Sequence, residues 1–319
     1  MKLATDVHCE KNRFSLSLSD DVCVIGSCFA DAVGERLATA GFRVLRNPFG
    51  TLYNPASIAA AVARLDSAEP FTADDCVEMG AGAGRVCSFS HHTRFARPTA
   101  EEFLQEANAH LAADAAAWRR CGKVIVTLGT ARVWRALERP GQPVVANCLK
   151  RPAREFAHEL LDVDACAAHL RAIVASHPDK EFLFTVSPIR HMGDGAHANT
   201  VSKATLHLAV QQLLDSFEDT AITPCTPSRG MAGYSLSRTG NLEAKTAIRT
   251  SYFPAYEIMQ DELRDYRFYA EDLLHPSPTA VQIIWDRFVE ACVPETEQGQ
   301  IRRNEKTSRA SLHRPLLAP

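Results

Sequence analysis

The sequence predicts an α/β fold with a mainly parallel, flavodoxin-like central sheet. Short apolar runs alternate along the chain with segments of helical periodicity, a pattern typical of βαβ units. The composition, 46% hydrophobic and 23% charged over 319 residues, is that of an ordinary globular protein. A chain of this length can also bury a core large enough to enclose a cleft.

Five strands are predicted, and they are the apolar runs at residues 21–26, 42–45, 123–128, 181–186 and 251–258. The helices between them are predicted at residues 29–40, 54–65, 99–120, 162–176, 201–217 and 277–292. Several helix starts carry capping signals: Asn54 and Ser277 each precede a proline, Thr99 and Glu102 form a capping box, and Asp162 is a suitable N-cap.

These elements are expected to form one domain over residues 1–293, with an irregular insertion at about residues 66–98 that contains short antiparallel strands. Residues 294–319 are polar and basic with few large apolar side chains, so a poorly ordered tail is expected there.

Composition also bears on location and partners. The N-terminal residues show no apolar signal-peptide core, and no apolar run reaches the roughly 18 residues that span a bilayer. A cytoplasmic protein that does not bind membranes is therefore expected. Because the net charge is only −3, no nucleic-acid partner is expected either. The ten cysteines are scattered without a C-x-x-C pair, which favours free thiols in a reducing compartment. Oligomeric state is left open.

In open parallel sheets, ligands bind at the carboxyl ends of the strands, near a topological switch point. The segments expected at that edge are residues 26–28, 47–53, 129–130, 187–191 and the loop with Asp272 and His275.

The first of these segments is the Gly26-Ser27-Cys28 turn between a strand and a helix. Helix N–H groups at such a turn stabilise an anion, lower a thiol pKa and can hold an oxyanion. A tight turn that merely buries a small cysteine explains the same residues.

The second is Asp272-Leu-Leu-His275, just before the predicted helix at Ser277. Asp272 can orient the imidazole of His275 through its Nδ1 side and leave Nε2 to act as a base. A surface histidine beside a loop aspartate is the alternative.

Residues 24–30 (VIGSCFA) resemble the signature of the GSCFA family, whose name spells residues 26–30. Further blocks of the resemblance are NPFGTLYNP at 47–55, TLGT at 127–130, SPIRH at 187–191, YFPAYEI at 252–258, DELRDYRFY at 261–269 and DLLHPS at 272–277. The resemblance covers roughly residues 5–290, and its blocks stand in the family's order. That family resembles the SGNH, or GDSL-type, hydrolases, which implies a three-layer α/β/α sandwich around a parallel sheet of five strands.

The resemblance also implies site residues. In register with the family pattern, Cys28 stands at the nucleophile position, with Ser27 as the alternative. His275 is the implied base and Asp272 its orienting partner. Gly50 matches an oxyanion glycine. In the family pattern an asparagine after the third strand is a further oxyanion donor, but no asparagine follows that strand here. Thr130 is one alternative for this donor, and Asn54 or Asn147 from elsewhere in the chain are the others.

Residues outside these blocks' catalytic positions can also serve in binding. Arg190 and His191 can hold a substrate carboxylate or phosphate, or else form a surface ion pair. Neither His91-His92 nor Cys148 has further ligands at metal spacing, and both nucleotide-loop patterns are absent after the first strand. No cofactor or metal is expected.

The expected function is a hydrolase or acyltransferase that acts on an ester, thioester or amide of a small or acylated substrate. The rival is a non-catalytic module that uses the same cleft to hold a small anionic ligand through Arg190 and His191.

Overall fold

The computed structural model describes residues 5–218 and 249–312, and a parallel sheet of five strands forms its centre. The strands are β1 (Asp21–Gly26), β2 (Arg43–Arg46), β5 (Lys123–Leu128), β9 (Glu181–Val186) and β10 (Arg249–Tyr252). Their order is β10-β9-β5-β1-β2, and every neighbouring pair is parallel. Counted along the chain this is the flavodoxin-like order, with its switch point between β1 and β5.

Eight α-helices are described: α1 (Cys28–Ala40), α2 (Pro55–Ser67), α3 (Ala100–Arg120), α4 (Val163–Ala175), α5 (Ala196–Glu218), the short α6 (Ala255–Glu257), α7 (Pro278–Cys292) and α8 (Glu295–Leu312). The predicted N-caps are confirmed, because Asn54, Thr99, Asp162 and Ser277 each accept a hydrogen bond from a main-chain N–H of the first turn.

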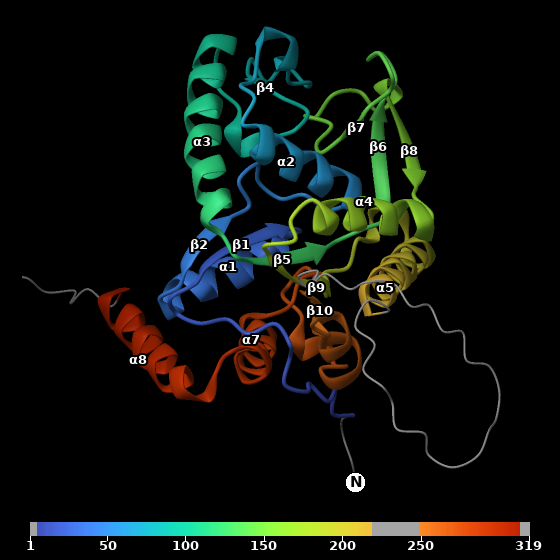
Figure 1. Cartoon of the computed structure of the whole chain (residues 1–319). Coiled ribbons are helices and arrows are strands. Elements are labelled where there is room, and N and C mark those ends of the chain that lie inside the picture. The colour runs from blue at the N-terminus through green and yellow to red at the C-terminus, as the bar shows by residue number, and fades with distance from the viewer. Residues whose placement is uncertain (1–4, 219–248, 313–319) are drawn as a thin grey trace, which may run out of the picture.

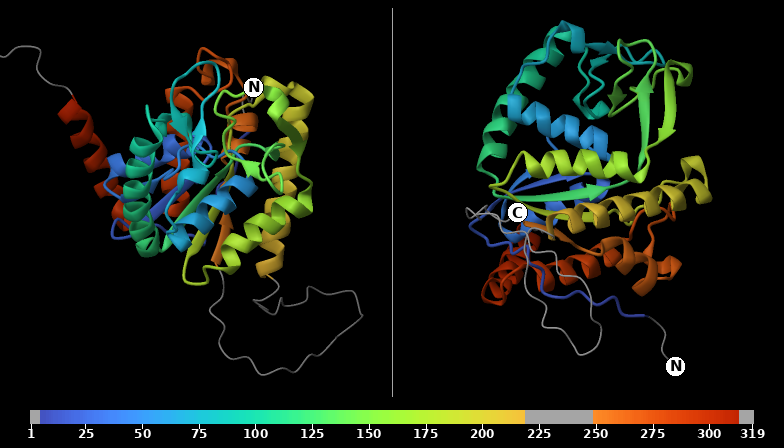
Figure 2. Two further views of the ribbon diagram at one scale, coloured as in Figure 1. Left: turned by 90° about the horizontal axis from the view of Figure 1, so that it is seen from above. Right: turned by 45° about the vertical axis from the view of Figure 1, so that its right-hand side comes forward.

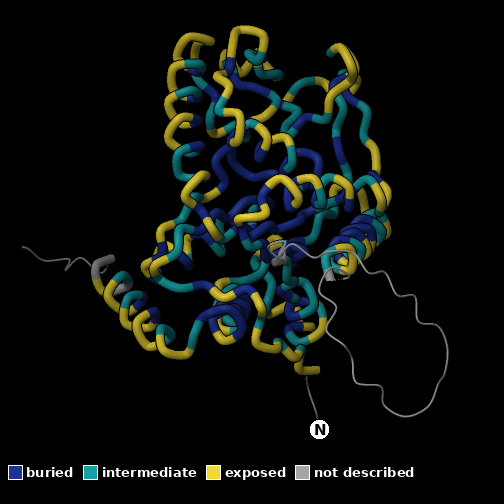
Figure 3. The backbone as a smooth tube through the Cα atoms, viewed as in Figure 1, coloured by how far each residue is buried: buried dark blue, intermediate teal, exposed yellow. Residues whose placement is uncertain are grey.

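The helices cover the sheet on both faces (Figure 1). α2, α3, α4 and α5 pack on one face, and α1 and α7 on the other. Alternate residues of β1 enter different cores: Cys23 and Ile25 face the first layer, whereas Val22 and Val24 face the second. β1, β5 and β9 are accordingly buried almost throughout (Figure 3), whereas the edge strand β2 is partly exposed. The three-layer α/β/α sandwich is confirmed.

Two small antiparallel sheets stand beyond the α2 and α4 layer, away from the central sheet (Figure 2). One consists of β3 (Val77–Glu78) and β4 (Val86–Cys87), in the region expected to be irregular. The other has the order β7-β6-β8 and was not predicted. Its strands are β6 (Arg132–Ala136), β7 (Val144–Val145) and β8 (Phe156–Leu160). These strands have five, two and five residues, too few for a periodic pattern to stand out in the sequence.

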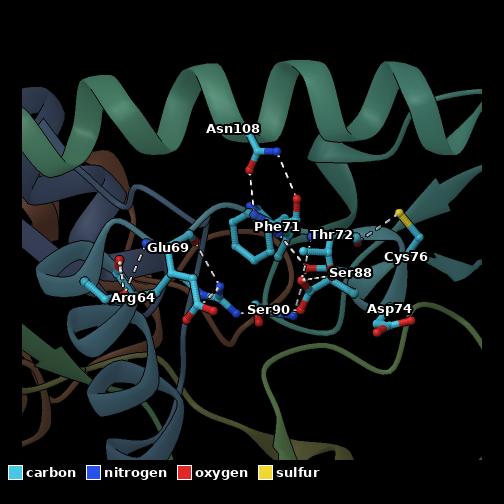
Figure 4. Close-up of polar contacts among 12 residues, drawn as sticks. Arg64, Glu69, Phe71, Thr72, Asp74, Cys76, Ser88, Ser90 and Asn108 are labelled. Atoms are coloured by element: carbon cyan, nitrogen blue, oxygen red, sulfur yellow. Dashed lines mark hydrogen bonds and ion pairs between the residues drawn. The ribbon is translucent and has the colours of Figure 1, made fainter.

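The inserted segment is held against α3 by a side-chain amide (Figure 4). Asn108 accepts from the N–H of Phe71 at 2.7 Å and donates to its carbonyl at 3.0 Å. The rings of Phe71 and Phe49 pack against the buried His91. The insertion therefore shares the core of the domain.

Two sequence predictions for the C-terminal part are wrong. The last strand, expected over residues 251–258, ends at Tyr252 and gives way to α6. The expected disordered tail is the helix α8 over residues 295–312, because residues on one of its faces dock. Ile301 is buried, Asn304 donates to the carbonyl of Ala40 at 2.7 Å, and Glu305 accepts from the indole of Trp285 at 2.7 Å. Residues 313–319 lie outside the described part.

The nine cysteines in the described residues are free thiols, and Cys225 lies outside those residues. Within the same residues, no helix has both the length and the apolar character needed to cross a membrane.

Candidate functional site

The turn after β1 is forced against β5. Gly26 has φ of +140°, and a Cβ there would lie 2.0 Å from the carbonyl oxygen of Thr127. Only glycine fits such an approach. The next N–H, that of Ser27, donates to the same carbonyl at 3.0 Å. The chain thus leaves β1 at the switch point and enters α1 at once.

Ser27 and Cys28 have different surroundings in this turn. Ser27 is fully buried, shares a hydrogen bond of 3.0 Å with the hydroxyl of Thr127, and caps α1 by accepting from the N–H of Phe29. Cys28 is half-buried, and its Sγ lies 3.6 Å from Nε2 of His275. Of the two candidates, Cys28 is the one that reaches the predicted base.

His275 is oriented by Asp272 from its other side. Nδ1 of His275 lies 2.6 Å from Oδ2 of Asp272, while Oδ1 of Asp272 accepts from the N–H groups of Leu274 and His275 at 2.9 and 3.0 Å. These main-chain bonds, followed by the bond from the ring of His275, lower the pKa of Asp272 to about 2. Because the carboxylate is charged, Nδ1 of His275 carries the proton and Nε2 is left to accept one.

The prediction that the helix N-terminus lowers the pKa of the Cys28 thiol below its ordinary value is wrong. Burial, followed by the charge of Asp31 on the same helix, raises the pKa of Cys28 above its ordinary value. The N–H groups of Cys28 and Phe29 and the charge of Lys203 act in the opposite direction. Desolvation exceeds the effect of the helix N-terminus at this position. The thiol is therefore protonated at neutral pH, and forming the thiolate requires a base.

The donors expected around an oxyanion are largely engaged elsewhere. The N–H of Gly50 donates to the carbonyl of Asn47 at 2.8 Å, and the N–H groups of Gly129 and Thr130 both donate to the carbonyl of Tyr53. The hydroxyl of Thr130 pairs with Ser202 at 2.8 Å.

The two alternative asparagines accept at turns through their side-chain oxygens, Asn54 from Ser57 and Asn147 from Leu149. By contrast, the N–H of Cys28 is at the first position of α1, where a helix leaves the N–H without an intrahelical acceptor.

Arg190 and His191, predicted as a pair, point to different places. The guanidinium of Arg190 lies over the ring of Tyr269, 5.6 Å from its centroid, and donates to the carbonyl of Leu273 at 3.3 Å. The ring of His191 packs edge-to-face on Tyr53, 5.5 Å between centroids. Burial lowers the pKa of His191 to about 4. His191 is thus a neutral imidazole whose charge would interact with Lys203 and His275, whereas Arg190 supports the loop that carries His275.

Two residues of the site were not singled out in the sequence. Tyr53 has its pKa raised by burial, and the Cys28 charge contributes to that shift. Lys203 is buried on α5, and its charge interacts with that of Cys28. Tyr53 falls within the family block at 47–55. Lys203 shares a helical stripe with Leu206 and Val210, so a lysine at an apolar position was the available signal.

In the described ranges, no three His, Cys, Asp or Glu side chains are grouped so that they could hold a metal ion. The site consists of a thiol, an imidazole and a carboxylate in one line, at the carboxyl edge of the sheet where the sequence predicted it.

The comparison with protein families agrees with the motif blocks. The model of the GSCFA family matches residues 21–225 and 237–288, which include the turn at Cys28 and the Asp272–His275 block. No curated protein and no solved structure matches the chain. Since the family match extends over most of the sequence, the chain belongs to the GSCFA family.

Proposed function

We propose that this protein is an acyl-transfer enzyme, a hydrolase or acyltransferase that attacks an ester, thioester or amide through Cys28. The observation that carries the proposal is the line of contacts from the Cys28 thiol to Nε2 of His275, at 3.6 Å, and from Nδ1 of His275 to Asp272, at 2.6 Å. A nucleophile, a base and an orienting group in this arrangement are what acyl transfer requires.

The reaction balances with these groups alone. His275 takes the thiol proton as the Cys28 sulfur bonds to the acyl carbon, and the carbonyl oxygen becomes an oxyanion. The oxyanion collapses, the bond to the leaving group breaks, and His275 returns the proton to that group. Water, an alcohol or an amine then attacks the thioester and gives its proton to His275. His275 passes that proton to the leaving Cys28 sulfur, which releases the acyl product and restores the thiol.

The charge state of the groups fits this sequence. Cys28 starts as a thiol, because burial raises its pKa, and Asp272 is an anion above a pH of about 2. The side chains of His275 and Asp272 are 47% and 46% exposed. A small or acylated substrate can therefore approach the base from solvent.

A panel of esters and thioesters tests the proposal on the full chain, with intact mass used to detect an acyl-enzyme. Cys28→Ala should abolish the mass adduct and turnover. His275→Ala should lower kcat by about 100-fold or more, the usual contribution of a general base. Asp272→Asn should cost a comparable or smaller factor because it disturbs orientation rather than removing the base.

His110→Ala is the matched control, since His110 is an exposed histidine on α3. Combining Cys28→Ala with His275→Ala should add little, because members of one catalytic unit are not additive. Unchanged turnover in both single variants would contradict the enzyme proposal.

The alternative, a binding module, draws on a different observation. Arg190 lines a pocket of about 370 Å³ together with Arg264, Tyr269 and Gln260, next to the loop that carries His275. In an enzyme, Arg190→Ala should act mainly through KM if it holds part of the substrate. In a binding module the same change should weaken ligand binding most, and changes at Cys28 and His275 should be nearly silent. Calorimetric titration of these variants beside the activity assay separates the two.

A further inference from the structure

Lys203 is a lysine in the interior of the protein, directly behind the site. Its side chain is 2% exposed, and Nζ donates to the carbonyls of Gly129 at 2.6 Å and Ser187 at 2.8 Å. Gly129 follows β5 and Ser187 follows β9. The amino group therefore bridges the carboxyl ends of two central strands, at the edge where Cys28 lies.

No carboxylate forms an ion pair with Lys203 among the described residues. The ionisable groups whose charges interact with it are Cys28 on α1, His191 after β9 and His207 on α5, while the ring of Tyr256 lies 6.0 Å from Nζ. Of these, Cys28 is the group that becomes an anion during the proposed reaction, and the two histidines are held neutral because burial lowers their pKa values. A buried cation without a counter-ion is costly, so an anion formed beside it is stabilised.

We propose that Lys203 is the fixed countercharge for the anionic states of Cys28, acting on the nucleophile from the carboxyl ends of β5 and β9 without touching the substrate. This inference deepens the proposed function, on which it rests: it names the positioning residue that offsets the desolvation of the Cys28 thiolate. The two carbonyl bonds hold Nζ in one place, and they survive loss of its proton, because a neutral amine still has two N–H donors.

The charge of Lys203 also gives the effect a pH limit. Burial lowers the pKa of Lys203 to about 7. Below that pH the ammonium is present and favours the thiolate of Cys28. As the pH rises through about 7 the ammonium is lost, and its effect on Cys28 fades.

The test measures the rate at which N-ethylmaleimide, a neutral reagent, labels Cys28 from pH 6 to pH 9. Peptide mass spectrometry resolves Cys28 from the other cysteines, and no acyl substrate is needed. Lys203→Gln keeps two N–H donors for the two carbonyls and removes the charge. At pH 6 it should label about tenfold more slowly than the natural protein, the effect of about one pKa unit. Toward pH 9 the two rates should converge.

Lys180 supplies the matched control. It is also buried, and its Nζ donates to the carbonyls of Trp118 at 3.1 Å and Cys121 at 2.7 Å. Both carbonyls precede β5, and Lys180 itself precedes β9, at the opposite edge of the sheet. Lys180→Gln removes a buried ammonium, one that also pairs with Asp179 at 3.8 Å, far from Cys28 and should leave the labelling profile unchanged.

A second variant, Lys203→Met, removes both charge and donors and should shift the labelling profile in the same direction as Lys203→Gln. Equal labelling of Lys203→Gln and the natural protein at pH 6, or an equal loss in Lys180→Gln, would overturn the inference. If no acyl substrate is turned over but labelling of Cys28 still depends on Lys203, the result contradicts the proposed function and not the countercharge. If turnover depends on His275 but labelling of Cys28 does not depend on Lys203, the result contradicts the countercharge and not the proposed function.

Discussion

At the scale of single residues, the turn after β1 places the proposed nucleophile through steric constraint. Gly26 has a positive φ and leaves no space for a Cβ beside Thr127, Ser27 caps the helix, and Cys28 is the first side chain left to reach His275. The choice of Cys28 over Ser27 in the proposal thus follows from which side chain the turn leaves uncommitted.

Gly26→Ala should therefore be strongly destabilising. The new Cβ would lie 2.0 Å from the carbonyl of Thr127, so β1 or β5 must shift. Backbone strain at an unfavourable φ costs about 1–3 kcal/mol by itself, and the clash adds to it. Gly82→Ala is the control, because Gly82 also has a positive φ but open space around it. Urea unfolding should show a clearly larger loss for Gly26→Ala, and equal losses would refute the steric explanation.

At the scale of elements, α8 shows that a polar composition can still encode a docked helix. Its sequence has low mean hydropathy, but residues 301, 304 and 305 share one face and contact the body of the domain. The prediction of disorder failed because composition averages over a helix, whereas docking depends on a few spaced positions.

Ile301→Ala tests the docking of α8. Removing a buried isoleucine should lower the free energy of unfolding by about 2 kcal/mol or more, because Ile301 is 1% exposed. Arg302→Ala, at the exposed neighbouring position, should change it by less than about 0.5 kcal/mol. A loss in Ile301→Ala no greater than in the control would mean that α8 does not dock in solution.

At the scale of the whole molecule, buried histidines should set the acid limit of stability. Burial lowers the pKa of His91 to about 3 and that of His191 to about 4, from an ordinary value of 6.5. Below pH 6.5 the unfolded chain binds protons at these histidines, whereas the native state does not. The free energy of unfolding therefore decreases as the pH is lowered, until the pH reaches the native pKa values of about 3 and 4. The loss is about 1.4 kcal/mol for each unit of pKa shift.

His91→Phe should remove its share of this loss, since a phenyl ring does not titrate and the site is already lined by Phe49 and Phe71. Urea unfolding between pH 7 and pH 4 should show a shallower decline for the variant. His197→Phe, at an exposed site on α5, should leave the slope as it is. The same slope in both variants would contradict the role of buried His91.

Local signals in the sequence determined the fold class, most helix starts and the two halves of the candidate site. Short apolar runs and helical patterns indicated the five central strands and the helices, and caps such as Asn54 and Ser277 were confirmed because a cap depends on residues within one turn. The antiparallel sheet β7-β6-β8 escaped prediction because its strands are short.

Only the tertiary structure brings the two halves of the candidate site, Cys28 and the Asp272–His275 block, into contact. Cys28 and His275 are 247 positions apart, so only the strand order and the packing of the late loop bring them to 3.6 Å. Burial depends on every packed element. It reversed the direction of the pKa shift expected for Cys28, and packing also buried Lys203, whose charge interacts with that of Cys28. Residue type and spacing thus determined which groups were available, while desolvation and long-range contact, which no short stretch of sequence encodes, determined their charge states and partners.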